Sequence, residues 1–282
     1  MRTRPALAPL LSLLAASLLA GCAPGGDAGE VDDAAEDGKA DGLTANAKVV
    51  YLNFGGGTIA HGDCNDATAS CSSMVLYDQT PIPAFDASPY GARSTIVNKI
   101  VADVRRYYAG LDVRFTTTRP ASGDYRMVMI GGKSLDSLGV WVLGRSYLDC
   151  GGGNGRAIAF VAPKHDSRPT PDASFDLLAP YDPLSGFRPA PEIQEWDEPL
   201  TEIPRAIAHE LGHTFGLIHT VGFSASNPSP ADIMCEEAAC RSESAFSFHD
   251  REMGVDAGQG HCDDSGVQSS LGLLQIAIGV AK

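Results

Sequence analysis

The segment AHELGHTFGLIH, residues 208–219, holds three of the chain's seven histidines and one glutamate. His209 and His213 are four residues apart, so a helix would place both imidazoles on one face, about one turn from each other. Two neutral imidazoles placed in this way can bind a single cation, and zinc accepts histidine nitrogen readily. Glu210 lies next to the first histidine, where a carboxylate can take a proton from a metal-activated water without binding the metal. The spacing therefore predicts a metal site with a base beside it.

The residues that follow supply a candidate third ligand. Gly216 comes three residues after His213, and a glycine there can adopt a positive φ and end the helix in a sharp turn. His219 can then turn back toward the first two histidines. Met234, in the segment ADIMC, follows fifteen residues later. The alternative is a helix with ordinary histidines and an ordinary core methionine, but the complete spacing makes coincidence improbable.

Residues 209–234 resemble the metzincin metallopeptidases, whose motif H-E-x-x-H-x-x-G-x-x-H precedes a methionine turn. The resemblance implies one catalytic Zn²⁺ bound by His209, His213 and His219. It implies that Glu210 is the catalytic base and that Met234 forms an apolar floor beneath the histidines. The implied function is a zinc-dependent endopeptidase that hydrolyses peptide bonds in a protein or peptide substrate. The subfamily stays unassigned, because Thr220 follows the third histidine where several subfamilies have a different characteristic residue.

Two other functions remain open. One is a non-catalytic, zinc-stabilised binding or adhesion lipoprotein. Glu210 argues against it, because a purely structural zinc site needs no base and usually has four protein ligands. The other is a zinc hydrolase of non-peptide substrates, which a preference for short non-peptide compounds would distinguish.

The histidines need a helix, and the surrounding pattern predicts the elements that would position it. Residues 48–57 alternate β-forming residues and predict a first strand. Ser94 is the candidate cap of a helix over 94–111, whose apolar residues recur at helical spacing. The metal-binding helix is expected from about Thr201, with Pro204 tolerable in its first turn. The other expected elements are strands at 112–120, 124–132, 140–148 and 156–163 and a C-terminal helix at 269–280.

This order agrees with the α+β zincin/metzincin-like fold that the resemblance implies. In that fold a twisted mixed five-stranded sheet and two long helices form an upper lobe, and a smaller irregular lower lobe carries His219 and Met234. The fourth strand, placed at 141–148, would be the antiparallel edge that rims the cleft, where substrate can add as an extra strand. The proline-rich residues 163–199 are a long insertion that either flanks the cleft or is peripheral.

The N-terminus predicts export. Arg2 and Arg4 precede an apolar run in residues 1–21, which is typical of a signal peptide. Leu19–Cys22, with the sequence LAGC, resembles the bacterial lipobox and implies a lipid on Cys22; an ordinary secretory signal is the alternative. Residues 22–43 are acidic and glycine-rich, so they predict a flexible tether, with a minimal inhibitory propeptide as the alternative.

The catalytic domain is then 44–282, and the expected location is the bacterial cell envelope, by lipid anchoring in the outer membrane or at the cell surface. The chain carries a formal net charge of -14, which argues against a nucleic-acid partner. We expect contact with the membrane through the N-terminal lipid only, and a monomer.

Six cysteines remain when Cys22 is set aside, and an even number in an exported chain suggests three disulfides. Local pairing of Cys64 with Cys71 and of Cys235 with Cys240 is the simplest arrangement, although six cysteines allow many connectivities. That pairing leaves Cys150 with Cys262, and the alternative for these two is a pair of buried free thiols.

Overall fold

The computed structural model describes residues 43–140, 142–166, 195–197, 199–221, 231–235, 246–255, 262 and 266–281. The predicted signal peptide, the tether apart from residue 43, and the predicted lipidation site Cys22 lie outside this part of the chain. Cys240 and most of the insertion at 163–199 also lie outside it.

A mixed five-stranded sheet forms the centre of the described fold, in the order β6-β1-β7-β9-β8. The strands β6, β1, β7 and β9 are parallel to one another, and β8 is antiparallel to β9 at one edge. The mixed sheet and the antiparallel edge agree with the sequence prediction, but the edge strand is shorter than residues 140–148. The strands are β1 (Lys48–Asn53), β6 (Val113–Thr116), β7 (Arg126–Ile130), β8 (Gly144–Ser146) and β9 (Ile158–Val161).

In the described residues, four helices accompany this sheet: α1 (Arg93–Tyr107), α2 (Ser134–Leu138), α3 (Glu202–Thr214) and α4 (Ser270–Ile278). The expectation that Ser94 caps α1 was wrong, because the helix begins at Arg93 after Ala92 and has no side-chain cap. The helix also ends before the predicted residue 111. Gly110, with a φ of 84°, turns the chain there toward β6. The predicted C-terminal helix is present as α4, and α2 was not predicted.

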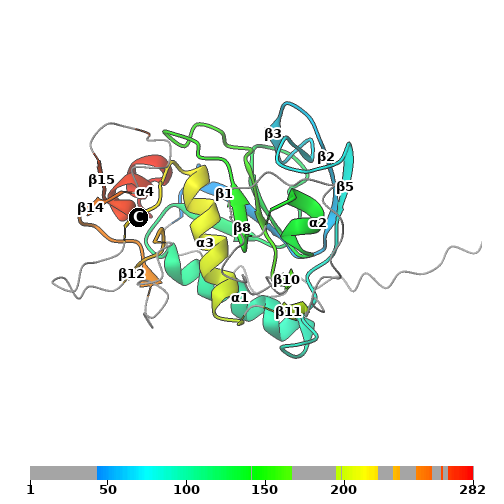
Figure 1. The fold of residues 1–282 in the computed structure, drawn as a ribbon. Helices are drawn as coiled ribbons and strands as arrows, with labels where there is room; N and C mark the ends of the chain where they lie inside the picture. Colours follow the sequence, from blue (N-terminus) through cyan, green and yellow to red (C-terminus); the bar gives the residue numbers. More distant parts are fainter. Residues whose placement is uncertain are drawn as a thin grey trace, which may run out of the picture. The chain divides into compact units, whose positions relative to one another are not determined.

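The two faces of the sheet pack against different layers, because side chains alternate along each strand. Val128 and Ile130 of β7 belong to the core shared with α1 and α3. Met127 and Met129 of the same strand belong to the opposite core, which includes Leu138 of α2. Figure 1 shows α1 and α3 lying next to each other, and α2 lying beside the small strand β5.

A small four-stranded sheet on the second face was not predicted from the sequence. Its strands run in the order β3-β4-β2-β5 and are β2 (Gly57–Ala60), β3 (Asn65–Asp66), β4 (Cys71–Ser72) and β5 (Gln79–Ile82). The disulfide Cys64–Cys71 closes the loop that contains β3, with its Cα atoms 5.8 Å apart. This agrees with the local pairing expected for these two cysteines.

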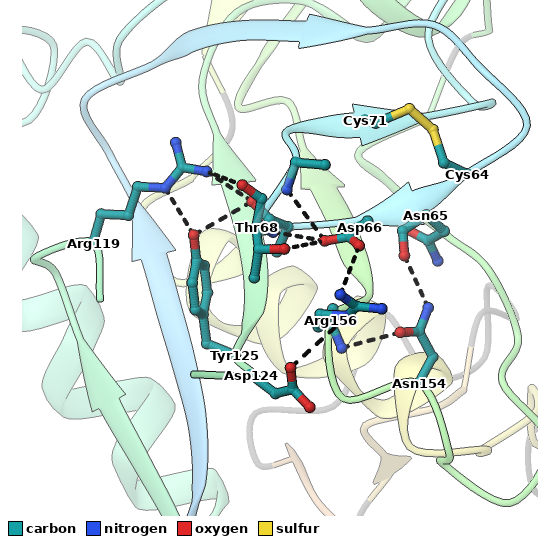
Figure 2. A network of polar contacts seen from close by, with 12 residues as sticks. Cys64, Asn65, Asp66, Thr68, Cys71, Arg119, Asp124, Tyr125, Asn154 and Arg156 are labelled. Carbon is teal, nitrogen blue, oxygen red and sulfur yellow. Dashed lines mark hydrogen bonds and ion pairs between the residues drawn. A yellow bond between two sulfur atoms is a disulfide. The ribbon is translucent and has the colours of Figure 1, made fainter. Parts of the chain in front are cut away.

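Two arginines attach this loop to the central sheet (Figure 2). Arg119 donates to the hydroxyl of Tyr125 at 2.7 Å and to the carbonyl of Ala67 at 2.8 Å. Arg156 forms an ion pair with Asp66 at 3.2 Å. Acceptors within the protein therefore engage both guanidinium groups. We assign the two arginines a structural role in stabilising this part of the fold.

Three further two-stranded ladders complete the described elements, and none was predicted. They are β10 (Lys164–Asp166) with β11 (Glu195–Asp197), β12 (Ala231–Asp232) with β13 (Phe246–Ser247), and β14 (Met253–Gly254) with β15 (Val267–Gln268). The first ladder closes the base of the 163–199 insertion. Among the described residues, no helix has the length and apolar character needed to cross a membrane.

Candidate metal centre

Helix α3 carries the first two histidines on one face. His209 and His213 are 7% and 8% exposed, so the helix presents them inward rather than to solvent. Its buried apolar residues, which include Ile207, pack in the core shared with α1 and the sheet. The hydroxyl of Tyr108, which directly follows α1, donates to the carbonyl of Ala208 at 2.9 Å and ties the two helices together next to the motif. Core packing and a buried hydrogen bond therefore fix the position of α3 relative to α1.

The turn after α3 brings the third histidine back to the same place. Gly216 has a φ of 95°, and a Cβ at this position would lie 3.1 Å from the carbonyl oxygen of Asp149. The positive φ strongly favours glycine, as the sequence predicted, and the tight contact adds to that preference. The amide of Leu217 then donates to Gly212 at 3.1 Å and closes the turn. His219 follows and is 8% exposed.

The three imidazoles converge on one point through their Nε2 atoms. The Nε2–Nε2 distances are 3.2 Å between His209 and His213, 3.0 Å between His209 and His219, and 2.9 Å between His213 and His219. Three histidines thus lie close enough to hold a metal ion. Among the described residues this is the one group of at least three possible ligands that meets that condition, and Glu210 is not part of it.

The hydrogen bonds of the other ring nitrogens show which tautomer His209 and His213 adopt. The Nδ1 atom of His209 lies 2.8 Å from the carbonyl of Ile233, and that of His213 lies 2.7 Å from the carbonyl of Leu217. A carbonyl only accepts hydrogen bonds, so each Nδ1 carries the proton and each Nε2 presents a lone pair. Two lone pairs that face each other 3.2 Å apart repel unless a cation lies between them. The donor set fits a metal ion, and backbone carbonyls behind the ligands are usual at zinc sites.

His209 and His213 are held in the uncharged form that binds metals. Burial, together with the smaller effect of the neighbouring His219, lowers the pKa of His213 to about 4, although the hydrogen bond to Leu217 opposes the shift. Burial likewise lowers the pKa of His209 well below its ordinary value. Both imidazoles are therefore neutral near pH 7, and no proton has to be displaced from them when a cation binds.

Glu210 lies beside the histidines and faces the edge strand β8. It is 6% exposed, and its Oε2 accepts a hydrogen bond of 2.7 Å from the hydroxyl of Ser146. Gly144, also on β8, leaves the space in which the glutamate side chain lies. The sequence singled out Glu210 but not Ser146 or Gly144, since their proximity depends on β8 packing against α3.

Met234 packs against α3 close to the ligands. It is fully buried, and a Cβ on Gly212 would lie 2.7 Å from its sulfur. The amide of Thr220 donates to the carbonyl of Met234 at 3.0 Å, so the segment after His219 runs beside the methionine. The structure thus brings Met234 to the histidine cluster, as its position in the sequence suggested.

A buried carboxylate that the sequence reasoning missed organises the methionine segment. Asp232 accepts hydrogen bonds from the amides of Met234 at 2.9 Å and His249 at 3.0 Å and from the hydroxyl of Ser270 at 3.0 Å. Burial raises the pKa of Asp232, and these three donors oppose the shift. The only signal in the sequence is an acidic residue two positions before Met234.

Arg126 was missed as well, because an arginine in a strand suggests a surface position. It is 2% exposed, and its guanidinium lies over the ring of Phe215, 4.1 Å from the centroid. It donates to the carbonyl of Gly152 at 2.7 Å and to that of Thr214 at 3.4 Å. Burial lowers its pKa to about 10, so it stays protonated at neutral pH. The cation therefore holds the C-terminal end of α3.

A disulfide lies at the same end of the helix. Cys150 pairs with Cys262, with Cα atoms 5.0 Å apart, so the free-thiol alternative for these cysteines was wrong. Cys262 also contacts the carbonyl of Gly216 through its sulfur at 3.5 Å. Cys235 is disulfide-bonded too, and Cys240, its expected partner, lies outside the described residues.

In comparisons with known proteins, no protein-family model and no curated protein matches the chain. An inference about function therefore has to come from the chemistry of the site.

Proposed function

We propose that the chain is a zinc-dependent endopeptidase of the metzincin type. One observation carries the proposal. Three buried histidines direct their Nε2 atoms at one point, within 3.2 Å of one another, with the carboxylate of Glu210 next to them but not among them. A structural zinc site would complete its coordination with a fourth protein ligand, whereas three ligands leave a position for a reactant.

In this proposal each residue has a separate task. His209, His213 and His219 hold Zn²⁺, which when bound supplies Lewis-acid activation of a water molecule and of the scissile carbonyl. Glu210 accepts the proton of the attacking water and delivers it to the leaving amine. Met234 contributes apolar packing beside the ligands and takes no part in proton transfer.

The edge strand offers a way to bind an extended peptide. In the described part of the chain, β8 pairs with β9 and with no second strand. Backbone groups on the other edge could therefore pair with a substrate segment as an added strand, which gives affinity through the main chain. Binding of this kind places a peptide along the strand that contacts Glu210.

Cleavage of a diverse peptide library tests the proposal. The mature protein is loaded with zinc and incubated with peptides, and new termini are identified by mass spectrometry. We expect internal cuts that disappear when zinc is chelated and return when it is restored. A protein that binds zinc but cuts no peptide would contradict the proposal and favour the binding lipoprotein. Turnover of small non-peptide substrates, without peptide cleavage, would favour a zinc hydrolase of non-peptide substrates.

A further inference from the structure

The edge strand β8 contacts the proposed catalytic base through two residues on one face. Gly144 and Ser146 are two positions apart, so their Cα–Cβ directions lie on the same side of the strand. On this side Ser146 donates its hydroxyl hydrogen to Oε2 of Glu210 at 2.7 Å. A Cβ on Gly144 would lie 2.5 Å from Oε1 and 2.7 Å from the carboxyl carbon of the same glutamate. One residue thus binds the carboxylate, and the other leaves room for it.

We propose that Ser146 is a positioning residue that fixes the carboxylate of Glu210 for proton transfer. This inference rests on the proposed peptidase function. A hydrogen bond to a carboxylate is charge-assisted, and it is stronger than one between neutral groups. Because it holds Oε2, it selects one orientation of the carboxylate plane among those that rotation about the last side-chain bond would allow. A glutamate side chain has three rotatable bonds, so restricting its orientation matters for a base that must reach a defined water.

Gly144 contributes to the same restriction by its shape. The backbone of β8 can approach α3 closely because residue 144 has no side chain, and the hydroxyl of Ser146 then reaches the glutamate directly. A side chain at 144 would push Glu210 away or separate the strand from the helix. Placement of the base therefore depends on the packing of β8 as well as on α3.

The test uses Ser146→Ala, with Ser146→Thr as the variant that keeps the hydroxyl. Tyr147→Phe is the matched control, because it removes a hydroxyl from the next residue, whose partner is Ser73 and not Glu210. We expect Ser146→Ala to lower kcat roughly 10- to 100-fold, the scale of a small misplacement of a catalytic group, while KM stays near the wild-type value. Ser146→Thr should recover most of the loss, and Tyr147→Phe should match the wild type.

Zinc content and unfolding provide measurements that do not depend on turnover. Each variant should bind one zinc ion per chain with wild-type affinity, because no ligand has changed. In zinc-free protein, a double-mutant cycle of Ser146→Ala with Glu210→Ala should show coupling in the free energies of unfolding, since the two side chains interact directly. Coupling between Ser146 and Glu210 in unfolding, together with a loss of activity confined to kcat, supports the positioning role of Ser146.

Failures of the two proposals can be told apart. If the wild type cleaves peptides and Ser146→Ala has the same kcat, the role of Ser146 is wrong and the peptidase function stands. If Ser146→Ala loses zinc and activity together, or if Ser146→Thr fails to recover activity, the serine is only structural and the inference is also wrong. If the zinc-loaded wild type cleaves nothing, the proposed function is overturned and the role of Ser146 falls with it.

Discussion

At the scale of single residues, the histidine cluster depends on backbone carbonyls as much as on the side chains that would bind a metal. Ile233 and Leu217 accept from the Nδ1 atoms of His209 and His213 and so direct the Nε2 lone pairs inward. Leu217 is in the turn that follows α3, and Ile233 directly precedes Met234. The tautomers therefore depend on that turn and on the methionine segment being in place.

Arg126 gives a prediction at this scale. Arg126→Met would leave the buried carbonyl of Thr214 and the half-buried carbonyl of Gly152 without this donor, and it would remove the cation from the ring of Phe215. We expect a loss of about 2–4 kcal/mol in the free energy of unfolding and weaker zinc binding, because the end of α3 is loosened. Arg114→Met, at an exposed position of β6, should change stability by less than about 0.5 kcal/mol. Urea unfolding measures the stability of both variants. Equal stability of the two would contradict the role of Arg126.

At the scale of elements, the disulfides differ in what they connect. Cys150–Cys262 spans 112 residues and joins the loop beside the end of α3 to the C-terminal part of the chain. Cys64–Cys71 spans 7 residues and closes a local loop in the small sheet. Entropic stabilisation by a disulfide grows with the length of the closed loop, so the first should stabilise the fold more.

Replacing each pair with serine tests this order. We expect the Cys150→Ser/Cys262→Ser variant to lose about 3–5 kcal/mol and the Cys64→Ser/Cys71→Ser variant to lose less. Only the first should weaken zinc binding, because it releases the loop that packs against Gly216. Thermal unfolding and zinc titration of both variants give the comparison. A Cys150→Ser/Cys262→Ser protein that keeps wild-type stability and zinc affinity would show that the disulfide does not support the site.

Strong local patterns predicted α1, α3 and the turn that brings the third histidine back. Each pattern specifies local geometry: the spacing of His209 and His213, the positive φ that glycine allows at residue 216, and the apolar periodicity before residue 107. The small sheet has strands of two to four residues, which is too short for a periodic signal. Ser146 and Glu210 are 64 residues apart, and their contact exists only because β8 joins the sheet next to α3. No local rule in the sequence contains that contact.

At the scale of the whole molecule, the proposed attachment of the chain depends on residues outside the described part. The sequence LAGC before residue 23 leads us to propose that the mature protein begins at Cys22 and carries a lipid there. Two acyl chains or a chain with a second signal are needed for stable anchoring, and a lipoprotein signal supplies more than one chain.

Substitution of the proposed lipidation site tests attachment. Cys22→Ala should abolish incorporation of labelled fatty acid and leave the protein out of the membrane fraction after a high-salt wash. The wash matters because the chain carries a net charge of -14 and could be retained through ions. A Cys22→Ala protein that stays in the washed membrane fraction would refute the lipid anchor, without bearing on the zinc site.

The proposed peptidase site is tested most directly by measuring zinc content and peptide cleavage on the same samples of wild type, Glu210→Gln and His213→Ala. We predict that Glu210→Gln keeps one zinc ion per chain and loses at least ~100-fold in kcat, because the base is gone while the ligands remain. His213→Ala should lose both zinc and cleavage. Cleavage by Glu210→Gln as fast as by the wild type, or zinc binding by His213→Ala with wild-type affinity, would overturn the proposed peptidase site.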